Sequence, residues 1–205
     1  MKKKRLFLVL FLIFTTFVSV LFLFKGGNGG NSTKDNIKTV SVQTAKLVAQ
    51  ESLVSFESWR SPKLQESYTL YDLNGNPSAY LFNVSDNYGK AGYVTISAQT
   101  KIDPVVAISD STETPIISAL QLVNELTLGT MYEQEDIKSQ YLYLGGSNYY
   151  VRLQVREGEN TQIIYYSIQN GTTKEITQEE IQSKQDLFED YFEDSAEQKW
   201  KPFSS

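Results

Sequence analysis

The chain of 205 residues contains no cysteine and no histidine. Without a thiol or an imidazole it lacks nearly all nucleophile–base pairs, all thiol chemistry and the common zinc sites. A serine–lysine dyad is equally unsupported, because no Ser-x-x-Lys motif occurs, and no glycine-rich phosphate loop is present. We therefore expect a protein that is not an enzyme and that binds no metal or cofactor.

Basic residues are scarce beyond the N-terminus. Five of the 19 Lys and Arg residues lie at or before Lys25, which leaves 14 basic against 24 acidic residues and a formal charge of −10 for the remainder. An acidic domain repels the phosphate backbone of nucleic acids and anionic lipid headgroups. We expect no nucleic-acid partner, and without cysteine the domain must depend on a packed core rather than on disulfides.

The longest uncharged stretch runs from Leu6 to Phe24, nineteen residues with three hydroxyl side chains as the polar members. At about 1.5 Å per residue, a helix of this length is about 28 Å long, close to the thickness of a bilayer's hydrocarbon core. Four basic residues precede the stretch, which places the N-terminus in the cytoplasm. We predict a single-pass anchor in the cell membrane, with the C-terminal domain extracellular.

A cleaved signal peptide is the alternative, and it would yield a secreted protein. Signal peptides have apolar regions of about 7–15 residues that end at small residues. The run here is longer and ends without a small pair, which favours an uncleaved anchor. The predicted organisation is a basic segment (1–5), the anchor (6–24), a flexible Gly- and Asn-rich stalk (25–40) and one domain (41–205), with a sub-boundary near 129–139 as an alternative.

Three amphipathic helices are predicted in the domain. The first begins at the N-cap Ser41 and ends before Trp59 to Pro62, because apolar residues recur in it at three- and four-residue spacing. The second follows Thr114 and ends at Gly129. The third opens with a capping box at Thr177 and continues to Trp200.

Short strands are predicted between the helices. Ser67 to Leu73 alternates as a strand, and the Asn-Gly turn after it is a strong hairpin signal. Ala79 to Asp110 contains three further strands that pair in sequence as a meander. Three more strands follow between Gln140 and Ile168, and their many tyrosines are expected to pack as cross-strand pairs with their hydroxyl groups outward. An exposed tyrosine platform for carbohydrate or peptide is the alternative.

The central meander resembles the prodomain of streptopain-type (C10) cysteine proteases and the related stand-alone inhibitors. The matching segments are Tyr80 to Asn83 (Y-x-x-N), Gly92 to Ser97 (G-[FY]-V-x-[IV]-S) and Pro104 to Asp110, which ends in Ser-Asp. The resemblance covers residues 79–110 and extends more weakly over 41–110. It implies a protein that inhibits, or assists the folding of, a separate cysteine protease.

The expected fold is α+β, an antiparallel β-meander with amphipathic helices on one face, in which Tyr93, Ile96 and Val106 are protected from solvent. The expected function is non-catalytic binding of a protein partner, with a cysteine protease as the candidate. An inhibitor needs an exposed loop that enters a cleft, and the candidate loop consists of Ser85, Asp86, Asn87, Tyr88, Gly89, Lys90 and Ala91.

The alternative function is a cell-surface binding or sensing module for a peptide, a wall polymer or a partner membrane protein. Such a module would present a contiguous exposed aromatic patch of more than a few hundred Å².

Overall fold

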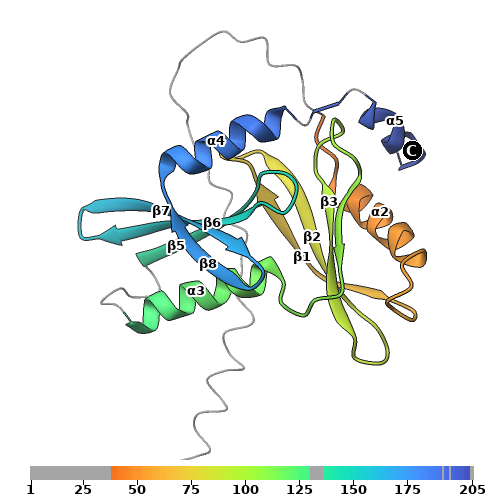
Figure 1. Ribbon diagram of the computed structural model, residues 1–205, viewed down its shortest axis with the longest axis horizontal. Coiled ribbons are helices and arrows are strands. Elements are labelled where there is room, and N and C mark those ends of the chain that lie inside the picture. Colours follow the sequence, from red (N-terminus) through yellow and green to blue (C-terminus); the bar gives the residue numbers. More distant parts are fainter. Residues whose placement is uncertain (1–37, 130–135, 191, 194, 204–205) are drawn as a thin grey trace, which may run out of the picture. The chain divides into compact units, whose positions relative to one another are not determined.

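The computed structural model describes residues 38–129, 136–190, 192–193 and 195–203. In it, two runs of four strands, each preceded by a helix, form a single sheet of eight strands (Figure 1). The first half of the sheet comprises α2 (Val42–Val54), β1 (Lys63–Tyr71), β2 (Pro77–Ser85), β3 (Ala91–Ser97) and β4 (Val105–Ser109). The second half comprises α3 (Pro115–Gly129), β5 (Ile137–Tyr143), β6 (Tyr149–Glu157), β7 (Asn160–Gln169) and β8 (Thr172–Ile176). Three short helices follow: α4 (Gln178–Glu189), α5 (Ala196–Trp200) and η3 (Lys201–Phe203).

The strand order is β4-β3-β2-β1-β5-β6-β7-β8, so each half is an antiparallel meander, as the sequence predicts. The two halves meet where β1 pairs with β5 in parallel, with Tyr71 opposite Leu142. This parallel junction is absent from the predicted antiparallel sheet, because it joins strands that lie far apart in the sequence. Residues 36–205 form one compact unit.

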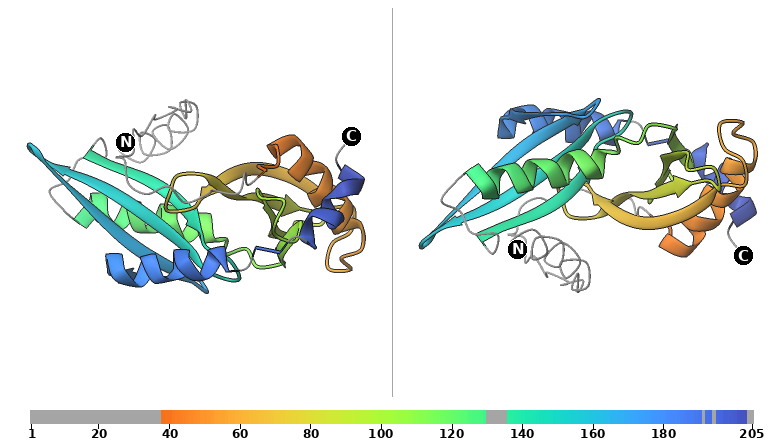
Figure 2. Two further views of the ribbon diagram at one scale, coloured as in Figure 1. Left: turned by 90° about the horizontal axis from the view of Figure 1, so that it is seen from above. Right: turned by 90° about the horizontal axis from the view of Figure 1, so that it is seen from below.

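Helices pack on both faces of the sheet, so the prediction that they cover one face is wrong. Tyr80, Phe82 and Val84 of β2 contact a core cluster that contains the buried face of α2. Ala79 and Leu81 of the same strand belong to a second cluster, which contains buried residues of α3 and α4. Figure 2 shows α2 and α3 on opposite sides of the sheet. Because successive strand residues point to opposite faces, the apolar run in β2 requires a covering layer on each side.

Local signals place the helix starts correctly. The Ser41 side chain accepts a hydrogen bond from the Thr44 backbone N–H at the start of α2. The predicted capping box is present at α4, where the side chains of Thr177 and Glu180 each accept a backbone N–H. Each such cap stabilises its helix by about 1 kcal/mol.

The long final helix predicted to reach Trp200 is interrupted. α4 ends at Glu189 and a separate short helix, α5, begins at Ala196. Acidic residues follow one another at four-residue spacing across the break (Glu189, Asp190, Glu193 and Asp194), and like charges at this spacing destabilise a helix. Negative charge at a helix C-terminus also opposes the helix dipole.

Two further differences concern the edges of the folded unit. Val40 N–H donates to Ala98 O at 2.8 Å, and Thr100 N–H donates to Lys38 O, so the end of the predicted stalk (25–40) belongs to the domain. The edge strand β8 is missing from the prediction because its five residues contain one large apolar side chain, that of Ile176. The predicted protection from solvent is confirmed for Ile96, which is fully buried, whereas Tyr93 and Val106 are half-buried.

The predicted anchor (6–24), the basic segment (1–5) and residues 25–37 of the predicted stalk lie outside the described residues. Within the described part of the chain, no helix has the length and apolar character needed to cross a bilayer.

Four tyrosines of the second half are buried, and they include a cross-strand pair of the predicted kind: Tyr143, Tyr149, Tyr150 and Tyr165. Tyr143 lies opposite Tyr149 across β5 and β6, with ring centroids 5.2 Å apart. Their hydroxyl groups are also turned inward, contrary to expectation: that of Tyr149 shares a 2.9 Å hydrogen bond with buried Thr95, and that of Tyr143 donates to Gly146 O. Burial raises the pKa of Tyr149 and raises the pKa of Tyr150 to about 12.

Alkaline pH should therefore lower the stability of the folded protein. The folded state holds the Tyr150 phenol protonated, so its contribution to stability is complete below pH 10.0 and is lost as pH rises through about 12. The free energy of unfolding should fall in this range by up to about 1.4 kcal/mol per pH unit for such a tyrosine. Urea unfolding at several pH values, followed by circular dichroism, measures the slope.

The variant Tyr150→Phe is the matched comparison, because the Tyr150 hydroxyl makes only a long 3.4 Å contact with Asn148 Oδ1. Its stability should decline less steeply between pH 10 and about 12 than that of the parent chain. If the stability of the two proteins declines equally with pH, Tyr150 has the same pKa in the folded and unfolded states, which would contradict the prediction.

Candidate partner-binding surface

The predicted binding loop, residues 85–91, is the tip of the hairpin that joins β2 to β3, and Ser85 and Ala91 pair at its base. Asp86 organises the tip. Its Oδ1 accepts hydrogen bonds from the backbone N–H groups of Tyr88 at 2.8 Å and Lys90 at 2.9 Å. Gly89 has φ +82°, a conformation that glycine adopts without steric strain. The tip is therefore held in one backbone conformation by its own residues.

The carboxylate of Asp86 also reaches a second segment. Its Oδ2 accepts a 3.3 Å hydrogen bond from the backbone N–H of Arg60, in the connection between α2 and β1. Desolvation raises the pKa of Asp86, but the hydrogen bonds from Lys90, Tyr88 and Arg60 outweigh it and hold the pKa below its usual value. The carboxylate is consequently ionised at neutral pH, and these bonds weaken only as pH falls below 3.8.

Tyr88 projects from the tip with 74% of its surface exposed. The guanidinium carbon of Arg60 lies 5.7 Å from the centre of its ring, within the range of a cation–π interaction. An exposed contact of this kind contributes about 0.5–1 kcal/mol. Arg60 thus limits the orientations of a side chain that is otherwise open to solvent.

The end of β4 supplies a third segment. Lys90 Nζ forms a 3.1 Å ion pair with Asp110 Oδ2, and Ser58 Oγ donates to the same oxygen at 3.3 Å. Both members of the ion pair are largely solvent-exposed, so its contribution to stability is small. We call Ser58, Arg60, Tyr88, Lys90 and Asp110 together the hairpin-tip surface. The structure brings its three segments together at one end of β2, β3 and β4.

The packing beneath this surface is close. A Cβ at Gly92 would overlap the Ser109 carbonyl oxygen and the ring of Trp59, which is itself 5% exposed. Only glycine permits this approach of β3 to β4.

Sequence reasoning identifies the loop but not its neighbours. Arg60 and Ser58 lie in a stretch that the sequence marks only as a helix end, and no motif links them to residues 85–91. Asp110 has a weak signal, since it closes the third segment of the prodomain resemblance.

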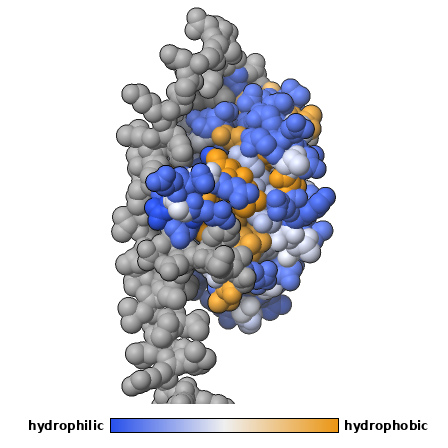
Figure 3. Space-filling view, turned by 90° about the vertical axis from the view of Figure 1, so that its left-hand side faces the viewer, coloured by the Kyte–Doolittle hydropathy of each residue, from blue (hydrophilic) through white to orange (hydrophobic). Residues whose placement is uncertain are grey.

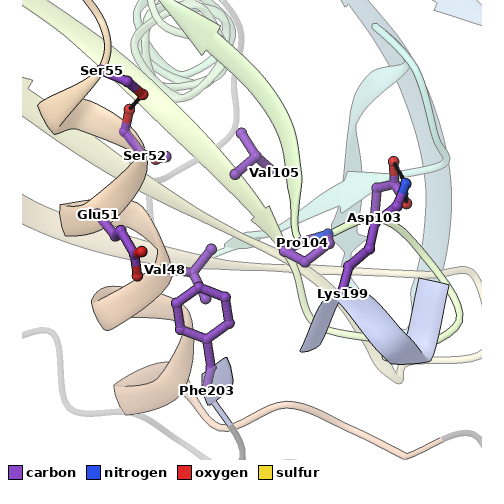
Figure 4. Close-up of a pocket in the computed structure, with 9 residues that line it drawn as sticks. All are labelled: Val48, Glu51, Ser52, Ser55, Asp103, Pro104, Val105, Lys199 and Phe203. Atoms are coloured by element: carbon purple, nitrogen blue, oxygen red, sulfur yellow. Dashed lines mark hydrogen bonds and ion pairs between the residues drawn. The ribbon is translucent and has the colours of Figure 1, made fainter. Parts of the chain in front are cut away.

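An open groove of about 400 Å³ lies on another part of the surface, between α2 and the start of β4 (Figure 4). Its third wall comes from residues Ala196–Phe203, which we call the C-terminal clasp. Lys199 Nζ lies 2.6 Å from Asp103 Oδ1, and Trp200 Nε1 donates to Ile102 O at 2.9 Å. In Figure 4 the Phe203 ring lies beside Val48 of α2. Besides apolar groups and this ion pair, the groove is lined by three polar residues of α2 and its C-cap, Glu51, Ser52 and Ser55.

Exposed aromatic side chains are rare. Among the described residues, Tyr88 is the one exposed aromatic residue. Figure 3 shows apolar residues on the face of the second half as a band between hydrophilic residues. The exposed large apolar side chains of that half and of α4 are aliphatic: Ile117, Leu120, Leu128, Ile163 and Leu187. The described residues therefore offer no aromatic platform of the kind expected for a binding module.

Within the described part of the chain, no group of three or more acidic side chains is placed to hold a metal ion. Comparison of the chain with protein-family models, with curated proteins and with solved structures gave no match.

Proposed function

We propose that this chain is a non-catalytic, membrane-anchored extracellular protein that binds a protein partner through the hairpin-tip surface. The proposed partner is a papain-like cysteine protease, whose active-site cleft would receive residues 85–91. Binding would lower the activity of the protease, or assist its folding, through shape and burial alone. The proposal needs no reactive group from a chain that contains neither cysteine nor histidine.

The main support for this proposal is that Tyr88, an exposed aromatic residue, lies in an ordered loop. Tyr88 is 74% exposed, yet Asp86 fixes the backbone on both sides of it and Arg60 lies against its ring. A loop that is ordered before binding loses less conformational entropy when it enters a cleft. Aromatic residues in such positions are often the ones that contribute most to binding.

The prodomain resemblance supports the choice of partner. Its three segments, Tyr80 to Asn83, Gly92 to Ser97 and Pro104 to Asp110, lie in or beside the consecutive strands β2, β3 and β4. The candidate loop connects the first two segments, and the last residue of the third is Asp110, which pairs with Lys90.

Replacing Tyr88 by Ala should weaken binding by about 2 kcal/mol, or about thirtyfold in Kd. The ring would be buried in the complex, and the variant would lose the desolvated contacts that the ring makes there. The full-length chain, purified in mild detergent, would be titrated against streptopain-type and other papain-like proteases. Residual protease activity and complex formation would both be measured.

Leu128→Ala serves as the matched control, since Leu128 is an equally exposed large side chain on α3 (80% exposed) and lies outside the hairpin-tip surface. It should leave the Kd unchanged. Absence of inhibition and of complexes at micromolar concentration would reject the protease partner. Recovery of wall or membrane components in the same preparations would then favour the surface-binding alternative.

A further inference from the structure

A cleft of about 380 Å³ is lined by residues from both halves of the sheet. Tyr93 of β3 and Tyr149 of β6 line it, with ring centroids 6.5 Å apart and planes at 90°. The turns β5–β6 and β7–β8 and the connection from β4 to α3 supply the rest of the lining. The volume is within the range of sites for small molecules or single side chains, about 300–1,000 Å³.

One charge lies in this cleft. Among the described residues that line it, Glu113 is the only ionisable residue besides the two tyrosines. The others carry hydroxyl, amide or apolar groups: Ser109, Ser111, Pro115, Ser147, Ile168, Gln169, Asn170 and Gly171. A ligand with a negative charge would be repelled, whereas a cation would find one opposite charge and several neutral acceptors.

The position of the carboxylate is set by two successive serine turns. Ser109 Oγ accepts the N–H of Ser111, and Ser111 Oγ accepts the N–H of Glu113. The carboxylate itself lies against the β7–β8 turn, because a Cβ at Gly171 would overlap Glu113 Oε2. The turn can approach this closely because Gly171 has no side chain and adopts φ +75°.

The Glu113 side chain also lies beside the start of α3. Glu113 precedes Thr114, whose side chain accepts the Ile117 N–H at the start of α3. Negative charge is stabilised near a helix N-terminus. Glu113 occupies that region itself, so the helix end offers no vacant site for an anion.

We propose that this cleft binds a protonated primary amine, with the Glu113 carboxylate as charge partner and the rings of Tyr93 and Tyr149 as its aromatic wall. An ammonium group donates three hydrogen bonds and is attracted to aromatic faces. A lysine side chain of a peptide and a free amino sugar both have this chemistry. The site is independent of the proposed function, because no residue of the hairpin-tip surface lines it.

Isothermal titration of the full-length chain would test the site with two amines and their neutral counterparts. The probes are a blocked Gly-Lys-Gly tripeptide and glucosamine, compared with the Nε-acetylated tripeptide and N-acetylglucosamine. Each amine that binds should lose at least tenfold in affinity on acetylation, and affinity should fall with added salt. Tighter binding of the tripeptide would identify a lysine side chain as the ligand. Tighter binding of glucosamine would identify a free amino sugar.

The variant Glu113→Gln removes the charge and keeps the shape, and it should weaken amine binding at least tenfold. Glu159→Gln is the control, because Glu159 is an exposed acid in the β6–β7 turn and does not line the cleft. It should bind as the parent does. Failure of both amines to bind at millimolar concentration, or equal binding by the Glu113→Gln variant, would overturn the proposal.

Discussion

Replacing Trp200 by Ala should lower the free energy of unfolding by about 4 kcal/mol, since removal of a buried aromatic side chain leaves a cavity. Trp200 is 2% exposed and belongs to the core cluster that contains the buried face of α2. Its indole N–H also donates to Ile102 O. The C-terminal clasp is therefore a structural part of the first half of the sheet, although it follows the second half in the chain. Urea unfolding followed by circular dichroism measures the change.

Two variants separate packing from other effects. Trp200→Phe keeps most of the ring but loses the hydrogen bond to Ile102 O, and should lower stability by about 1–2 kcal/mol. Leu128→Ala truncates a side chain that is 80% exposed and should change stability by less than about 0.5 kcal/mol. A loss of under about 1 kcal/mol for Trp200→Ala would mean that the clasp does not contribute to the core.

The second large loss of stability is expected from a substitution that adds a single methyl group. Gly92→Ala should destabilise the protein by about 3 kcal/mol, because the added methyl group would overlap backbone atoms of Ser109 and Asp110 and the ring of Trp59. Strand β4 or the α2–β1 connection must then move. The same movement would disturb the hairpin-tip surface, so partner binding should weaken together with stability.

Gly75→Ala separates this overlap from general effects of losing a glycine. Gly75 has φ +82° in the β1–β2 turn, and a Cβ there would meet no atom within 4 Å. Its replacement should destabilise by about 1 kcal/mol through backbone strain alone. Equal losses for the two variants would indicate that β3 and β4 tolerate separation at Gly92.

Short-range patterns in the sequence account for much of this fold. The N-cap Ser41, the capping box at Thr177 and the Asn-Gly turn at Gly75 each depend on residues within four positions of one another. Period-two alternation in β2 likewise predicts which of its side chains share a face. These features depend on the stereochemistry of neighbouring residues, so they can be inferred from short stretches of the sequence.

Features that depend on distant partners were predicted wrongly or missed. The parallel pairing of β1 with β5 joins Tyr71 to Leu142, and no property of either residue specifies the other. The break between α4 and α5 allows Glu193 N–H to reach Lys101 O at 2.8 Å, a contact that helical periodicity cannot reveal. The edge strand β8 depends on β7 for its pairing rather than on its own composition.

The hairpin-tip surface likewise has some features that depend on neighbouring residues and others that depend on distant ones. Turn-forming residues predict the loop at Ser85 to Ala91, because positive φ at Gly89 and side-chain acceptance by Asp86 are local. The contacts of Arg60 with Asp86 and Tyr88 bridge segments more than twenty positions apart. Local serine turns position Glu113, but no local pattern indicates that its carboxylate lies against the turn at Gly171.

The clasp also determines when folding can finish. Its hydrogen bond from Trp200 to Ile102 spans 98 positions, and its ion pair from Lys199 to Asp103 spans 96. During synthesis, α2 and β1–β4 leave the ribosome well before Trp200, so their shared core is incomplete until the chain has grown past the entire second half. Contacts of such high sequence separation slow folding. The first half should therefore gain its full protection from hydrogen exchange only after Trp200 has packed into its core, and not before the second half in the order of synthesis.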